Sequence, residues 1–325
     1  TDHVAAVIRA LEAHGMSTIP VFFSNFSDDG YEGLKRILDQ YFRPDGVPII
    51  DVAVSLVSFS RSSTYSFTGV EETNYFRDCL NVPIVFGLTV AGDYHDFEDD
   101  RIGLSKNDME ANVTYPELNG DIITVPIAYR PRTKGNRRSL PIPDRIEHLC
   151  RVAYGWGKLR STPKKDRKVA ILMWQSVANS GNIGGAAGLD TMETIANELK
   201  RFRDEGYTVT DVPENGEALV KEILDNVTND LDNLPVEYMR KHAADMMSKK
   251  DYVGHFESIP EWNQEMKIKD WGEPPGTLCT DGDDMVIPGL VKGNIYVGYQ
   301  PLRGRAEKFA QNIHDQIGRA SCRER

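Results

Sequence analysis

The sequence predicts an α/β fold made of successive doubly wound units, Rossmann-like or flavodoxin-like, with parallel sheets and a helical insertion. Two observations predict it. Short apolar runs alternate with amphipathic helical patterns over residues 1–130. Residues 168–212 then give an apolar run, a loop of small residues, a helical stripe and a second apolar run. Chains with this order of elements form parallel sheets with helices on their faces.

Residues 1–130 are predicted to form an N-terminal α/β domain, and we expect its first strand to be missing from the chain. The apolar run at residues 49–59 predicts a strand that is covered on both faces. Ser105, three residues before Asp108, predicts the N-cap of a short helix. Further strands are expected at residues 18–23, 82–88 and 122–127, and helices at residues 4–11, 31–41 and 70–80.

Residues 131–167 are predicted to form a basic linker and a bridging helix. The segment 130–138 is rich in arginine and turn residues, which is typical of a solvated connection. A contact with a polycarboxylate or a phosphate is the alternative. The helix is expected to start at Ile142 or Asp144 and to end near Leu159.

Residues 168–234 are predicted to form the strand–helix–strand unit of a second α/β domain. Asp190 is expected to be the N-cap of its helix, and Glu193 stands at the spacing of a capping box. Gly206 is typical of the residue that ends a helix, and a strand is expected to begin at residues 207–209. A second amphipathic helix is expected at residues 217–231.

The remaining residues are predicted to form an insertion and a return to the second domain. Residues 235–275 are expected to be a helical insertion whose methionines fill its core. Residues 276–316 contain two short predicted strands, at 285–287 and 295–299. We expect residues 317–325 to be a non-native tail, because they resemble the translation of a sequencing adapter.

Composition limits the classes of function. The 325 residues carry a formal net charge of −11, which argues against non-specific binding to nucleic acid or to an anionic membrane surface. No apolar run approaches the roughly 20 residues that span a bilayer, and no signal segment is expected. The four cysteines are far apart, which is typical of reduced thiols in a cytoplasmic protein.

The glycine-rich loop at residues 178–188 is the first candidate for binding. Its glycines permit close approach of a ligand to the backbone, and the following helix start offers free N–H groups. The spacing fits neither a P-loop nor a dinucleotide-binding fingerprint. A tight crossover that packs helix on strand is the alternative. The residues that a ligand would contact are Asn179, Gly181, Asn182, Gly184 and Gly185.

Two further stretches contain candidate ligands. Residues 93–100 include His95 and Glu98, which have the chemistry to bind a divalent ion, as does His255. The consecutive spacing gives poor geometry for a metal, so a solvated acidic loop is favoured and no metal ligand is assigned. Gln300 and Arg303 follow a predicted strand, at the end where open α/β sheets bind ligands. Arg303 would clamp a carboxylate; a surface ion pair is the alternative.

Several motifs resemble the large subunit of class II metal chelatases, which includes the cobaltochelatase CobN subunit and the magnesium chelatase H subunit. The most specific match is NSGNIGGAAGLDT at residues 179–191. The others follow in the same order as in the family: YFRPDGVPIID at 41–51, YPELNGD at 115–121, EGYTV at 205–209, PENGEAL at 213–219, WGEPPG at 271–276 and GNIYVGYQPLRG at 293–304. The resemblance covers nearly the whole chain and an internal part of a longer subunit.

The resemblance implies a scaffold that binds a tetrapyrrole and a metal, while ATP is hydrolysed by separate AAA+ subunits that act with a von Willebrand-type partner. The family motif Gly-Thr-His-Gly followed by Leu-Glu is absent from this sequence, so the catalytic residues stay unknown. GLD at 188–190, QPLRG at 300–304 and IHD at 313–315 resemble the cobalt enzyme. IDVAVSL at 50–56 and TDG at 280–282 resemble the magnesium enzyme. We therefore expect cobalt and hydrogenobyrinic acid a,c-diamide as substrates, with magnesium and protoporphyrin IX as the alternative. A non-catalytic small-molecule binding module is a further alternative.

Overall fold

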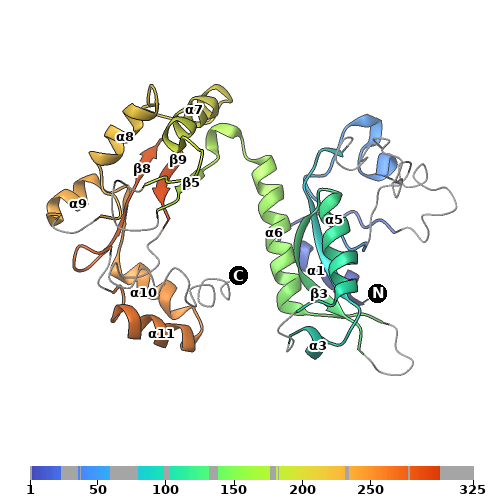
Figure 1. Cartoon of the computed structure of the whole chain (residues 1–325). Helices are drawn as coiled ribbons and strands as arrows, with labels where there is room; N and C mark the ends of the chain where they lie inside the picture. Colours follow the sequence, from blue (N-terminus) through green and yellow to red (C-terminus); the bar gives the residue numbers. More distant parts are fainter. Residues whose placement is uncertain are drawn as a thin grey trace. The chain divides into compact units, whose positions relative to one another are not determined.

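The computed structural model describes residues 2–22, 36, 38–58, 80–98, 103–131, 138–175, 181, 183–230, 234–276 and 279–300. The chain divides into two compact units, Thr1–Thr162 and Pro163–Arg325 (Figure 1). Within the described ranges, no helix is both long and apolar enough to cross a membrane.

Unit 1 is built on a four-stranded sheet in the order β1-β2-β3-β4. The strands are β1 (Ala53–Ser55), β2 (Ile84–Val90), β3 (Ile122–Tyr129) and β4 (Leu140–Pro141). The first three are parallel, and β4 runs antiparallel to β3. Every residue of β2 except Thr89 is buried, as expected for a strand between two neighbours with both faces covered.

Two long helices cover the core of this sheet. Apolar residues of α1 (Asp2–Ala13) and α6 (Pro143–Ser161) pack with β2 and β3, among them Val7, Leu149 and Ala153. Because α6 belongs to this core, unit 1 extends beyond residue 130, the limit that the sequence indicates. The shorter helices are η1 (Pro44–Gly46), α3 (Tyr94–Glu98), α4 (Lys106–Met109), the π-turn η3 (Glu110–Thr114) and α5 (Tyr115–Leu118).

Unit 2 contains a three-stranded sheet in the order β5-β9-β8. Its strands are β5 (Val169–Met173), β9 (Ile295–Tyr299) and β8 (Leu290–Lys292). β5 and β9 are parallel, with Met173 opposite Tyr299, and β8 is antiparallel to β9. One face is covered by α7 (Thr191–Asp204) and α8 (Gly216–Leu224), which lie side by side in Figure 1 and contribute residues such as Leu199 and Leu219 to a shared core.

The rest of unit 2 is a small helical region around a strand pair. β6 (Asp245–Met247) and β7 (Met285–Ile287) are antiparallel. Val227, Met239 and Val286 are buried together, and Met246 packs against them, so methionines do fill this core. The helices are η4 (Lys164–Asp166), α9 (Val236–His242), α10 (Lys249–Glu257) and α11 (Glu261–Trp271).

The structure confirms the α/β class with parallel strands and corrects several elements. Residues 207–209 form no strand: the Thr208 carbonyl accepts one hydrogen bond from the Asn294 backbone at 2.9 Å, and β5 pairs with β9 instead. Residues 18–22 also form no strand, and Phe22 is largely exposed. Of residues 49–58, the described part of the predicted strand 49–59, only Ala53–Ser55 pairs with another strand. The predicted helix 217–231 ends at Leu224, where the Asn226 side chain donates to the Glu222 carbonyl.

Candidate functional site

The carboxyl ends of β5 and β9 form one edge of the unit 2 sheet, because the two strands are parallel. The pairing continues one residue past β9, where the Gln300 N–H donates to the Met173 carbonyl at 2.8 Å. Open α/β sheets bind their ligands at this edge. The structure therefore places Gln300 where the sequence predicts it, whereas Arg303 lies outside the described residues.

Two buried amide side chains lie at the same edge. Gln175 is 1% exposed and Asn229 is 5% exposed. The Asn229 side-chain nitrogen donates to Gln175 Oε1 and to the Gln300 carbonyl, both at 2.9 Å. Burial of amides is costly unless they are hydrogen-bonded, so these contacts fix the side chains in place. Neither Gln175 nor Asn229 is among the binding residues predicted from the sequence; the one available signal is the position of Gln175 just after an apolar run.

The segment that brings Asn229 to this edge is itself held on both sides. The Val227 N–H donates to the His242 carbonyl at 3.2 Å, and the Val227 carbonyl accepts from the Gly289 N–H at 3.0 Å. Thr228 is buried, and its hydroxyl accepts from the Asp230 N–H at 3.1 Å. Asn229 thus reaches the strand ends from a fixed backbone.

The glycine-rich loop is attached to the end of β5 through Gly184. Its N–H donates to the Trp174 carbonyl at 2.8 Å, and its carbonyl accepts from the Thr191 hydroxyl at 2.5 Å. Gly184 has φ +71°, and a Cβ there would lie 3.0 Å from Thr191 Cγ2. Gly184 therefore meets a packing requirement, as the crossover interpretation expects. Gly181 and Gly185 are exposed, and Asn179 and Asn182 lie outside the described residues.

The helix that follows the loop starts as predicted, with one correction. Asp190 caps α7 by accepting from the Glu193 N–H at 3.0 Å. The Glu193 carboxylate does not complete a capping box. It accepts from the Gly216 N–H at 2.7 Å, at the start of α8, because Gly216 comes so close that a Cβ would lie 2.6 Å from the Glu193 nitrogen. A nonlocal contact has replaced the local one.

The weak metal candidates belong to different units of the chain. His95 is exposed on α3 of unit 1, and the side chain of Glu98 lies outside the described residues. His255 is exposed on α10 of unit 2. Among the side chains that the structure describes, no three His, Cys, Asp or Glu residues are grouped so as to hold a metal ion.

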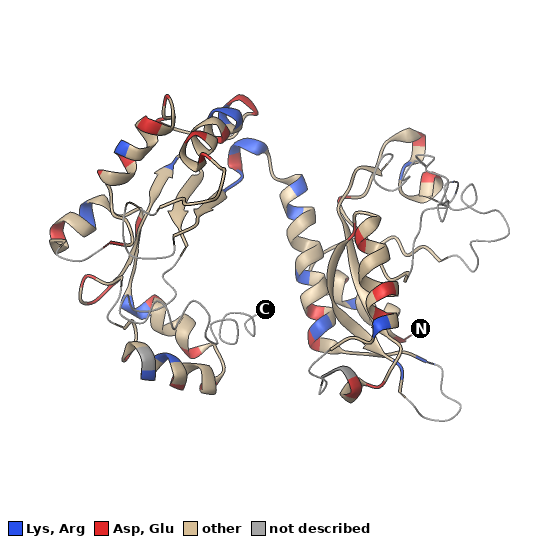
Figure 2. Cartoon of the chain, viewed as in Figure 1, with Lys and Arg blue, Asp and Glu red and all other residues tan. Residues whose placement is uncertain are grey.

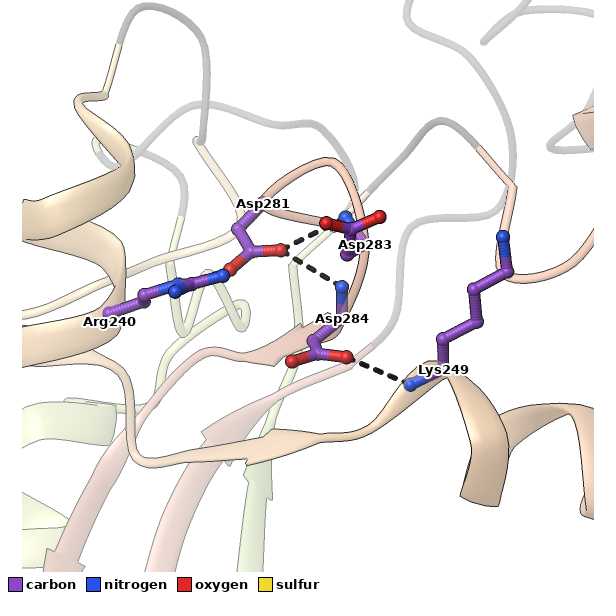
Figure 3. Close-up of polar contacts among 5 residues, drawn as sticks. All are labelled: Arg240, Lys249, Asp281, Asp283 and Asp284. Atoms are coloured by element: carbon purple, nitrogen blue, oxygen red, sulfur yellow. Dashed lines mark hydrogen bonds and ion pairs between the residues drawn. The ribbon is translucent and has the colours of Figure 1, made fainter.

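An acidic turn in unit 2 shows why carboxylates near one another need not bind a cation (Figure 3). Asp281 accepts from the N–H groups of Asp284 at 2.9 Å and Asp283 at 3.1 Å, and from Arg240 Nε at 2.5 Å. These donors, with the Asp284 N–H contributing most, lower the pKa of Asp281 to about 2. Asp284 accepts from the Lys249 N–H at 2.9 Å, at the start of α10. The turn joins α9, α10 and β7.

A second polar cluster, at the carboxyl end of β2 in unit 1, was also not predicted as a unit. Ser105 caps α4 as expected, and Asp108 and Asn112 beyond it are buried. Asp108 accepts from the Ala91 N–H at 3.1 Å, and Asn112 Oδ1 accepts from the Ser58 hydroxyl at 2.7 Å. The π-turn η3 places Asn112, and these contacts tie the helix to the sheet.

Charged side chains of both signs are spread over the helices of each unit (Figure 2). α8 carries an exposed Lys221–Glu217 pair, and Glu205 after α7 pairs with Arg201 and Lys164. Exposed pairs of this kind contribute little to stability. These exposed pairs therefore mark solvated helix faces, whereas the neutral amides of Gln175 and Asn229 are buried at the β5–β9 edge.

Comparisons with known proteins agree with the motifs. The family model described as CobN/Magnesium Chelatase matches residues 1–318. The chain is 27% identical to the aerobic cobaltochelatase subunit CobN of Pseudomonas aeruginosa, over 97% of this chain and 24% of that protein. It is 28% identical to the chloroplastic magnesium-chelatase subunit ChlH of Oryza sativa subsp. indica, over 93% of this chain and 21% of that protein.

A solved structure supports the fold. The catalytic subunit of cobaltochelatase from Mycobacterium tuberculosis matches with a TM-score of 0.71 and 24% identity, over 96% of this chain and 25% of that one. The chain thus spans about a quarter of the length of these relatives. Because the family model covers almost every residue, the resemblance seen in the motifs is confirmed, and the chain belongs to the CobN/Magnesium Chelatase family.

Proposed function

We propose that the chain is a tetrapyrrole- and metal-binding part of the large subunit of an ATP-dependent cobaltochelatase, with cobalt and hydrogenobyrinic acid a,c-diamide as substrates. Besides family membership, one structural observation supports this proposal. Gln175, Asn229 and Gln300 lie together at the carboxyl edge of parallel strands, beside the glycine-rich loop. Their hydrogen bonds hold the ends of these strands in place at the edge where open α/β sheets bind ligands, and a tetrapyrrole would lie against this edge.

The metal-insertion reaction requires groups that other parts of the enzyme would supply. Insertion forms nitrogen–metal bonds and removes two pyrrole protons, so it needs a base and a ligand set that delivers the metal. We assign those roles to the family's His- and Glu-containing motif, which is not in this sequence, and ATP hydrolysis to AAA+ subunits acting with a von Willebrand-type partner. The chain by itself is then inactive in insertion. The widely spaced cysteines support a cytoplasmic setting for this work.

Magnesium chelatase is the second candidate. The identities to CobN and ChlH are 27% and 28%, which do not separate the two metals. The segments 50–56 and 280–282 resemble the magnesium enzyme, whereas 188–190 and 300–304 resemble the cobalt enzyme. We favour cobalt because its motifs include the loop and the residues that follow β9.

The test is a metal-insertion assay with the longer subunit that contains this chain and its partner ATPases. Hydrogenobyrinic acid a,c-diamide with Co²⁺, and protoporphyrin IX with Mg²⁺, are supplied in parallel with ATP, and the absorbance change of the metallated product is followed. The proposal predicts turnover with the first pair. Turnover with the second pair alone would assign the magnesium reaction. Absence of insertion with both, in a subunit that binds tetrapyrrole, would favour a non-catalytic binding module.

A further inference from the structure

The side chain of Asn229 bonds the residues that follow two paired strands, β5 and β9, which are far apart in the sequence. Both hydrogens of its NH₂ group are used, one on Gln175 after β5 and the other on the Gln300 carbonyl after β9. A side chain at this position must supply two donors from one nitrogen to make both contacts. Carboxylate, hydroxyl and apolar side chains of similar size cannot do so.

The same contacts determine how the Gln175 amide is turned. The Gln300 carbonyl is a backbone acceptor, so the Asn229 atom facing it is the nitrogen. Because that nitrogen is a donor, the Gln175 atom 2.9 Å away is the oxygen. The NH₂ end of Gln175 is therefore directed away from Asn229. Gln175 is 1% exposed, so packing does not allow it to turn freely.

We propose that Asn229 is a positioning residue of this edge: it holds together the residues that follow β5 and β9, it sets the orientation of the Gln175 amide, and it thereby determines the affinity for tetrapyrrole. The ligand part of this inference rests on the proposed function. The clasp itself, meaning the two hydrogen bonds from Asn229 to Gln175 and Gln300, is independent of it.

Two variants break the clasp in different ways. N229L keeps the approximate volume and removes both donors. N229D keeps the shape and places a carboxylate oxygen against the Gln300 carbonyl. In N229D the Gln175 amide could donate to the new carboxylate only by turning over against its packing, which would restore one bond but reverse the amide. N215A is the matched control, because it removes the α8 cap that accepts from the Ala218 N–H at 2.9 Å and lowers stability away from the edge.

The first measurement is hydrogen exchange of the Gln300 N–H, which donates to the Met173 carbonyl. Both Asn229 variants are expected to accelerate it at least about tenfold relative to N215A at equal loss of melting temperature. The second measurement is the Kd of the chain for hydrogenobyrinic acid a,c-diamide and protoporphyrin IX. The variants are expected to raise it about tenfold or more, and N215A less than about twofold.

Each outcome decides one part of the inference. Gln300 exchange equal to that of N215A would overturn the clasp. Faster exchange with an unchanged Kd would overturn the positioning role, since a merely structural bond gives that result. A wild-type chain that binds neither tetrapyrrole would overturn the proposed function and the ligand part together, and the exchange data would still decide the clasp.

Discussion

Gly216 is one of the glycines of unit 2 at which two backbones pack most closely, and its replacement gives a sharp test of the structure. A Cβ at Gly216 would lie 2.6 Å from the nitrogen of Glu193 and 2.9 Å from the carbonyl carbon of Met192. These are backbone atoms of α7, so no side chain can move aside. α8 must shift as a whole, which also lengthens the 2.7 Å bond from the Gly216 N–H to Glu193.

The expected cost follows from two opposing effects. Overpacking of this kind lowers the free energy of unfolding by about 1–3 kcal/mol. Replacement of a helical glycine by alanine raises it by about 0.5–1 kcal/mol. G216A should therefore lower the free energy of unfolding by up to about 2.5 kcal/mol, with the middle of the range at about 1 kcal/mol. For a unit of this size, each kcal/mol lowers the melting temperature by about 2–4 °C.

Gly254 provides the matched control in the same unit. It is an exposed glycine within α10, and nothing lies within 4 Å of the position its Cβ would take. G254A should raise the free energy of unfolding by about 0.4–1 kcal/mol, because it restricts the unfolded chain without a clash. Urea unfolding of both variants checks the signs. If G216A is as stable as G254A, the close approach of α7 and α8 is wrong.

Three further experiments test separate features. Because the pKa of Asp281 is lowered, the contribution of its carboxylate to stability is present above the unfolded pKa near 4 and is lost as the pH falls toward 2. The difference in unfolding free energy between wild type and D281N should therefore shrink from about pH 6 to about pH 3. A difference that stays constant over this range would contradict the prediction. G298A should lower the melting temperature, since its Cβ would collide with the Tyr296 ring. The loss caused by G298A should be smaller in a Y296A background than in the wild type, and an equal loss in both backgrounds would contradict the collision. G184V should cost more than about 1 kcal/mol of unfolding free energy and G185V less than about 0.5, because Gly184 has φ +71° beside Thr191 and Gly185 is exposed; equal costs in urea unfolding would argue against the packed crossover.

The elements that the sequence predicts well are those fixed by neighbours a few residues away. Ser105 and Asp190 cap their helices as predicted, because each side chain bonds an N–H three residues on. The strands Met285–Ile287 and Ile295–Tyr299 match their predicted limits, since short apolar runs between turns define them. The residue types and their spacing are sufficient for such local structure.

The sequence patterns did not predict which distant segments pair with one another. β5 was expected to be followed by a strand at residues 207–209, and instead it pairs with β9, more than a hundred residues later. An apolar run shows that a segment can form a strand, but not which neighbour it takes. The predicted capping box at Glu193 is wrong for the same reason. Gly216 lies close to Glu193, and its N–H is a donor to the Glu193 carboxylate from outside the helix.

In the candidate site, too, the residue with a local sequence signal was predicted and the residue without one was not. Gln300 was predicted because ligand-binding residues follow the strands of open α/β sheets. Asn229 was not, because it stands in a connection after α8 and has no pattern of its own. Only the fold reveals that its side chain reaches the ends of β5 and β9.

The most direct test of the account is a hydrogen-exchange footprint of the chain with and without hydrogenobyrinic acid a,c-diamide. If the carboxyl edge of β5 and β9 binds the tetrapyrrole, the added protection should be concentrated at Gln175, Asn229 and Gln300 and at the loop around Gly184. Protection confined to the segments around His95 or His255, with this edge unchanged, would contradict the central claim.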